Sequence, residues 1–167
     1  MGPFEFLFLY WPAFSSAVRE LFFAQAVNSS IPMAKIENVH LLEEVFGNFP
    51  SFHDAEVLRI VLNRESVGIL PTLEALIYVF EMTSEIKDGK YVCKNHSLVT
   101  FQFREIDQLV LEGFNNQNAL QGLSVTDISD HQLEWLKFEV GIDGIFGLDA
   151  HFKCRSISVL SIEPYSN

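Results

Sequence analysis

The sequence is poor in cysteine and has no long apolar run. Its two cysteines, Cys93 and Cys154, lack the number and spacing of a zinc site or of a dense disulfide framework. We expect a reduced pair, as is usual in the cytosol. A single long-range disulfide is the alternative, because strands around the two residues could be neighbours in a sheet. No stretch of about 18 uncharged apolar residues occurs, which argues against a membrane-spanning helix.

Positive charge is also scarce. The chain has 11 Lys and Arg against 22 Asp and Glu, which gives a formal net charge of −11, and no basic run occurs anywhere. Proteins that bind nucleic acid neutralise phosphates with clustered cations, so we expect no nucleic-acid partner. A basic protein is the better expectation, because opposite charges accelerate association.

Apolar residues, in contrast, are plentiful. Of the 167 residues, 49% are hydrophobic and 16 are Phe, which excludes a mostly disordered chain despite the net charge. At this length a folded chain buries about 70% of the surface that its unfolded form exposes. The chain is therefore long enough for one domain with its own core.

Residues 1–32 differ in composition from the rest, because they hold six of the 16 Phe. One interpretation is a signal peptide, but Glu5 and Pro12 fit that pattern poorly. A second interpretation is a helix over residues 15–26 that docks on the main domain. A third is a segment outside the working protein, because Met33 begins a sequence that resembles a translation start.

We therefore take residues 33–167 as one functional domain and expect it to fold without residues 1–32. Its first element is predicted to be a helix that Asn38 caps and Gly47 ends. The apolar positions between them follow helical spacing: Val39, Leu42, Val45 and Phe46.

After residue 52 the apolar pattern changes to a period near two, which is typical of strands. We expect turns in the segment 84–94, around Asp88 and Gly89, at 131–132 and at 141–144. The predicted strands are 54–63, 72–83, 97–104, 106–112, 123–129, 133–142, 148–153 and 156–163.

One early helix and about eight closely spaced strands exclude a doubly wound parallel fold, which needs a helical crossover for each strand. The prediction is an α+β domain with a mainly antiparallel sheet, either strongly curved or doubled into a sandwich. Alternation places Val99, Phe101 and Phe103 on one face, and the residues expected to form a second core face are Leu136, Phe138, Val140 and Ile142.

The dyad of His53 and Asp54 is the most enzyme-like feature of the chain. A carboxylate beside an imidazole can fix its tautomer and raise its basicity. Adjacent residues of a strand point to opposite faces, however, so the pair can form only if the strand begins after it. A turn with a capping Asp and a half-buried His is the alternative reading.

No other set of residues indicates catalysis, a metal or a cofactor. The chain has no nucleophile elbow, phosphate loop or dinucleotide fingerprint. His151 and Cys154 have opposite parity on one strand, which argues against a shared metal site. Asp149 is expected to cap a turn or form a salt bridge. We expect no metal and no cofactor.

The segment 113–118 contains four consecutive carboxamides, Asn115, Asn116, Gln117 and Asn118, after Gly113 and Phe114. One reading is a structural loop, because Asn forms Asx-turns and tolerates left-handed backbone. The other is recognition, because carboxamides at a strand end can hydrogen-bond a partner without the desolvation cost of a full charge.

Three strings stand out: Phe52-His53-Asp54-Ala55-Glu56-Val57, Gly113-Phe114-Asn115-Asn116-Gln117-Asn118, and Phe146-Gly147-Leu148-Asp149-Ala150 leading to Ile157–Pro164. Together they resemble a small family of bacterial immunity proteins from polymorphic toxin systems, the one numbered fifty. The resemblance spans about residues 36 to 164. It implies a cytoplasmic, non-enzymatic protein that binds and neutralises a cognate toxin.

Two classes of function follow. An immunity protein would meet a basic toxin through a face that includes the carboxamides 115–118, with His53 and Asp54 nearby. A small enzyme of another type would instead need His53 and Asp54 to converge in one pocket with Asp149 and His151.

Overall fold

The computed structural model describes residues 32–64 and 70–166. Within them lie one α-helix, α2 (His40–Phe46), two short 3₁₀ helices, η3 (Met33–Lys35) and η4 (Ser129–His131), and eight strands. The strands are β1 (Glu56–Asn63), β2 (Thr72–Lys87), β3 (Lys90–Arg104), β4 (Asp107–Glu112), β5 (Leu120–Asp127), β6 (Phe138–Gly144), β7 (Asp149–Cys154) and β8 (Ser156–Pro164).

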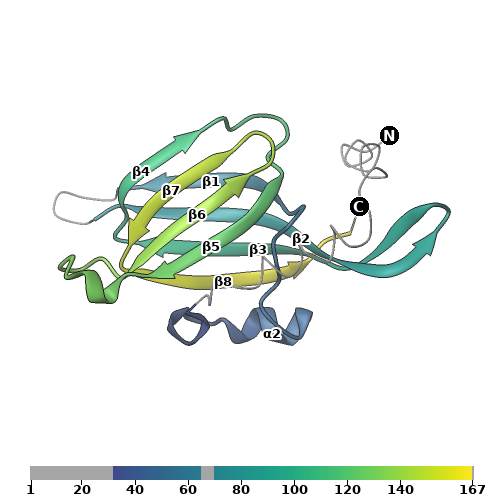
Figure 1. Cartoon of the computed structure of the whole chain (residues 1–167), viewed down its shortest axis with the longest axis horizontal. Coiled ribbons are helices and arrows are strands. Elements are labelled where there is room, and N and C mark those ends of the chain that lie inside the picture. The colour runs from purple at the N-terminus through teal and green to yellow at the C-terminus, as the bar shows by residue number, and fades with distance from the viewer. Residues whose placement is uncertain (1–31, 65–69, 167) are drawn as a thin grey trace.

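The strands form two antiparallel four-stranded sheets that lie face to face (Figure 1). Sheet A has the order β1-β2-β3-β8, and sheet B has the order β4-β7-β6-β5. The predicted class, one helix and an antiparallel arrangement of about eight strands, is confirmed. Of the two arrangements that the sequence left open, the structure has the sandwich.

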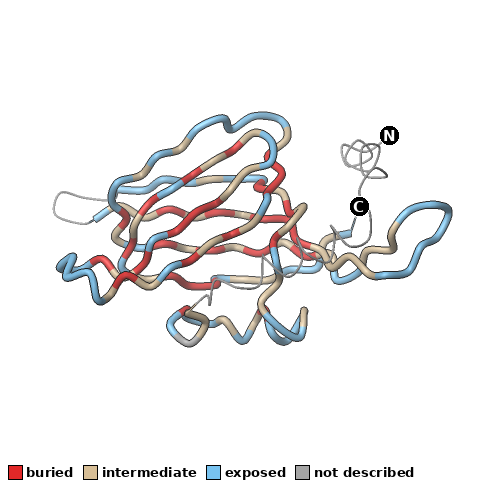
Figure 2. The backbone as a smooth tube through the Cα atoms, in the orientation of Figure 1, coloured by how far each residue is buried: buried red, intermediate tan, exposed pale blue. Residues whose placement is uncertain are grey.

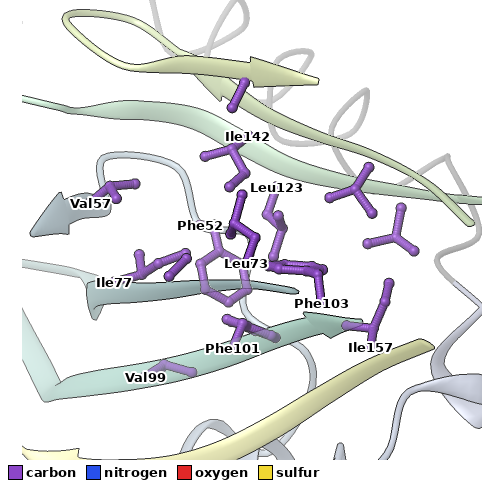
Figure 3. Packing of buried hydrophobic residues seen from close by; sticks show 14 of the residues in the cluster. Phe52, Val57, Leu73, Ile77, Val99, Phe101, Phe103, Leu123, Ile142 and Ile157 are labelled. Carbon is purple, nitrogen blue, oxygen red and sulfur yellow. The ribbon is translucent and has the colours of Figure 1, made fainter. Parts of the chain in front are cut away.

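The core lies between the two sheets, as the alternation of apolar residues predicts. Val99, Phe101 and Phe103 of β3 are fully buried on the inner face of sheet A. Phe103 meets Phe152 of sheet B with ring centroids 4.9 Å apart and the rings nearly perpendicular. Figure 3 shows buried side chains of sheet A, among them Phe101 and Phe103, converging with Leu123 and Ile142 of sheet B. The second predicted core face, Leu136, Phe138, Val140 and Ile142, is also buried.

Helix α2 ends as predicted but begins differently. Gly47 terminates it in the left-handed region, with φ 76°, and donates its backbone N–H to Glu43. Asn38 is not the N-cap, so that prediction is wrong. Val39 holds this position without a side-chain cap, because the Asn38 carboxamide donates instead to the carbonyl of Val159 on β8.

The β2–β3 hairpin is longer than the sequence suggested. The turn at Asp88 and Gly89 is confirmed, but only these two residues separate the strands, and the rest of the segment 84–94 is strand. Beyond Tyr78 the hairpin loses its β1 neighbour, and before Ser97 it has no β8 neighbour. Residues 81–94 therefore form a two-stranded arm that projects from the sandwich (Figure 1).

Two predictions in sheet B are wrong. Residues 133–137 are not strand, because η4 and a turn precede β6. Residues 141–144 are not a turn but lie within β6, and the turn follows at 145–148. Gly141 and Gly144 imitate a turn signal, yet the structure needs them for close contact: a Cβ on Gly144 would lie 2.1 Å from the carbonyl oxygen of Leu148.

Residues 1–31 of the expected N-terminal extension 1–32 lie outside the described residues, so a functional domain over 33–167 stays a prediction. From Met33 onward the chain is tied to the sandwich. Lys35 forms an ion pair with Asp127, and Glu37 pairs with Ser158 of β8. Among the described residues no helix is long and apolar enough to cross a membrane.

Candidate functional site

The strings 52–57, 113–118 and 146–150, which are far apart in the sequence, meet at one end of the sandwich. Asp54 donates its backbone N–H to Leu120, and Leu120 donates to Ala55, which joins the start of β1 to the start of β5. The backbone N–H groups of Ile145 and Phe146 both point to the carbonyl of Ala119. We call this region, made of residues 51–55, 113–119 and 145–148, the loop end (Figure 1).

Asn118 holds the loop end together. Its side chain is buried, with 4% exposed, and makes four hydrogen bonds. The Nδ2 group donates to the carbonyls of Val57 and Asn115, at 3.2 and 2.9 Å. The Oδ1 atom accepts from the backbone N–H groups of Asn115 and Leu148, at 2.9 and 3.2 Å. One carboxamide thus joins all three strings, which places Asn118 inside the fold.

The other carboxamides of the segment face the solvent to different degrees. Asn115 forms an Asx-turn, because its Oδ1 accepts from the Gln117 N–H at 2.9 Å and its Nδ2 donates to the Gly113 carbonyl at 2.9 Å. Asn116 is exposed, and its carboxamide makes no hydrogen bond to the described residues. Asn115 and Asn118 therefore shape the loop that displays Asn116 and Gln117.

His53 and Asp54 form a pair at the start of the loop end. The two residues lie in a turn before β1, where Asp54 has φ 62°, so the rule that strand neighbours face apart does not apply. The imidazole Nδ1 of His53 lies 3.0 Å from Asp54 Oδ2. The buried ring of Phe52 packs on Phe101 and fixes this turn to the core (Figure 3).

The hydrogen bond to Asp54, together with its charge, raises the pKa of His53 above the usual value, against the opposing effect of burial. A raised pKa in the folded state stabilises the protein fully below the unfolded pKa, and this contribution is lost as the pH rises through the folded pKa. Asp54→Asn keeps a residue that tolerates positive φ but removes the charge.

We therefore expect Asp54→Asn to lower the melting temperature most at about pH 5.5 and least at about pH 8.5, with thermal melts of both proteins as the measurement. Because the unchanged protein and Asp54→Asn contain the same other histidines, the titration of those histidines cancels in the difference between their melting temperatures. A difference between the two proteins that does not change with pH would show that His53 and Asp54 are not electrostatically coupled.

A second His and Asp group lies on the outer face of sheet B. His151 Nε2 is 2.9 Å from Asp149 Oδ1 and 3.8 Å from Asp143 Oδ1. Asp149 Oδ2 also accepts from the Gly144 N–H at 3.3 Å, so Asp149 both contacts the His151 imidazole and caps the turn. The four residues of the enzyme hypothesis thus form two pairs, one in the turn before β1 of sheet A and one on β7 of sheet B.

The cysteines are both free. Cys154 points into the core, where burial raises the pKa of its thiol to about 12, and His151 points to the opposite face of β7. Within residues 32–64 and 70–166 no group of three or more His, Cys, Asp or Glu side chains could hold a metal ion.

Sequence reasoning missed three exposed apolar residues at the loop end. Phe114, Ile145 and Phe146 expose 47%, 37% and 57% of their surface, and the segments that carry them are pale blue and tan in Figure 2. A signal was present, because Phe114 and Phe146 each adjoin a glycine between two strands. That position indicates a turn, and a large apolar residue in a turn is not in a core position.

The comparison with protein families gives one result. A family model described as Immunity protein 50 matches residues 38–165, which cover most of the chain and all three strings of the loop end. No curated protein and no solved structure matches the chain. The chain therefore belongs to the immunity protein 50 family.

Proposed function

We propose that this chain is a cytoplasmic, non-enzymatic immunity protein that binds and neutralises a cognate toxin. The family match over residues 38–165 is the observation that supports this most directly. The net charge of −11 agrees with a basic toxin, because opposite charges accelerate capture. The enzyme alternative gains no support, since its four residues lie in two separate pairs.

We place the toxin interface at the loop end, on Asn115, Asn116 and Gln117, with His53 and Asp54 beside them. Asn116 is exposed and its carboxamide bonds to none of the described residues, so it can donate and accept without breaking a hydrogen bond to them. Asn118, which the sequence analysis counted among the contact residues, contributes in this proposal by holding the loop in shape.

Co-expression tests the function directly. The toxin encoded beside this chain's gene should stop growth when expressed alone and should be tolerated when the chain is expressed with it. Purified toxin and chain should also form a stable complex. Growth arrest despite ample chain, together with no complex, would contradict the proposal.

Binding kinetics test the interface. We expect Asn116→Ala with Gln117→Ala to raise the dissociation rate from the toxin about tenfold, because removing short-range contacts acts mainly on the off-rate. Raising salt from about 0.05 to 0.5 M should instead slow association about tenfold. Surface plasmon resonance measures both rates, and unchanged kinetics in a well-folded double variant would remove this loop from the interface.

A further inference from the structure

We propose that Phe114, Ile145 and Phe146 form a hydrophobic anchor, which fills an apolar pocket in the toxin whose rim carries Lys or Arg. This inference rests on the proposed function and specifies the kind of surface that the partner presents. The three side chains belong to two different loops of the loop end, the 113–117 loop and the 145–148 turn.

The exposure of the two Phe side chains is unusual among the described Phe of this chain. Phe146 exposes 57% of its surface and Phe114 exposes 47%, although the remaining described Phe side chains are buried or half-buried. Large aromatic residues dominate the energy of protein interfaces when a partner buries them in a pocket. A pair of exposed Phe side chains with Ile145 is therefore suited to bind a partner and contributes nothing evident to the core.

The two loops are fixed against each other, so the anchor is already in place before binding. The backbone N–H groups of Asn115 and Leu148 both donate to Oδ1 of Asn118. Gly113 and Gly147 lie in direct contact, since a Cβ on Gly113 would be 2.1 Å from the Gly147 carbonyl oxygen. Because these contacts flank Phe114 and Phe146, little ordering of the backbone remains to oppose binding.

The charge around the anchor indicates the rim of the partner's pocket. Segments 51–57, 112–120 and 141–150, which make up the loop end and its immediate flanks, contain no Lys or Arg, and their carboxylates are Asp54, Glu56, Glu112, Asp143 and Asp149. A partner must therefore bring its own cations to the rim.

The same charges argue against other occupants of this surface. A second copy of the chain would place two sets of carboxylates against each other, which like-charge repulsion disfavours. The Phe-rich residues 1–32 carry two acidic residues and one Arg, so they also lack the positive charge that this surface requires.

The test uses the full chain and the toxin in solution, with Phe114→Ala, Phe146→Ala and the double variant. We expect each single change to weaken toxin binding at least tenfold and the double change at least a hundredfold, mainly through faster dissociation. The melting temperatures should stay close to that of the unchanged protein, because exposed side chains contribute little to the core. Leu133→Ala is the matched control, because Leu133 is also an exposed apolar residue but lies beyond the far end of β5.

The outcomes are distinct. If the unchanged chain does not bind the toxin, both the proposed function and the anchor are wrong. If it binds and the Phe variants bind as tightly as Leu133→Ala, the function stands and the anchor is wrong. Light scattering that shows a dimer of the unchanged chain but monomers of the Phe variants would assign the anchor to self-association and overturn the toxin pocket. Tighter toxin binding after removal of residues 1–32 would show that this segment covers the anchor in the free chain, and would overturn the toxin pocket.

Glu112→Lys tests the cationic rim. Glu112 is exposed and adjoins Gly113. The change should slow association several-fold at low salt and have little effect at high salt, because screening removes long-range attraction. An effect of equal size at both salt concentrations would contradict a cationic rim.

Discussion

Asn118→Leu is expected to lower the free energy of unfolding by about 3 kcal/mol and the melting temperature by about 10 °C. Leucine has nearly the same volume, so packing changes little. The leucine side chain, however, has no hydrogen-bond donor or acceptor. The N–H groups of Asn115 and Leu148 and the carbonyls of Val57 and Asn115 therefore lose their side-chain partner. Buried polar groups without partners are among the costly defects of a folded protein.

Asn116→Ala is the matched control, because it removes a carboxamide two residues away that is exposed and not bonded to the described residues. Its cost should stay within about 0.5 kcal/mol. Urea unfolding of both variants measures the difference. Equal stability of the two variants would show that Asn118 does not hold the loop end together.

This pair of variants also separates the two readings of the carboxamide segment. If Asn118 is structural, Asn118→Leu destabilises the protein before it affects binding. If Asn116 is a contact, Asn116→Ala weakens binding and leaves the melting temperature unchanged. The structural reading would then hold for Asn118 and the recognition reading for Asn116, two residues of the same loop.

The core could be predicted from the sequence because alternation is a local signal. Each strand shows its apolar face within a few residues, so the inward positions of β3 and β6 follow from parity alone. The signal for the end of α2 is equally local, since Gly47 can adopt the left-handed conformation that terminates a helix.

The predictions of an Asn38 N-cap and of a turn at 141–144 were wrong because the structure there depends on contacts between distant segments. Asn38 has the residue type of an N-cap, but Val159, which is 121 positions away, provides its acceptor. Gly141 has the residue type of a turn, but a Cβ there would lie 2.5 Å from the Ser124 hydroxyl oxygen on the neighbouring strand. No local pattern contains either fact.

The candidate site was predictable in part. The three strings of the loop end could be selected from the sequence, but their convergence on Asn118 could not, because it depends on the isolated bridge between Glu56 of β1 and Ala119, the residue before β5. His53 and Asp54 show the same limit. Their contact depends on where β1 begins, which is a boundary and not a periodic signal.

Gly113→Ala and Gly89→Ala should differ strongly in stability, although the two glycines have similar backbone conformations. Gly113 has φ 71° and Gly89 has φ 77°, so alanine pays a similar left-handed penalty of about 1 kcal/mol at both positions. Around Gly89, in the arm, a Cβ would meet nothing within 4 Å. Gly89→Ala should therefore cost about 1 kcal/mol in total.

At Gly113 the added methyl group would lie 2.1 Å from the carbonyl oxygen of Gly147, which is backbone and cannot rotate away. The two loops must separate, and such overpacking adds about 3 kcal/mol, for a total near 4 kcal/mol. Because this movement also displaces Phe114 and Phe146, the folded fraction of Gly113→Ala should bind the toxin more weakly, whereas Gly89→Ala should bind normally. Chemical unfolding and toxin titration of both variants provide the comparison, and equal losses of stability would mean that the contact between Gly113 and Gly147 does not hold the loops in place.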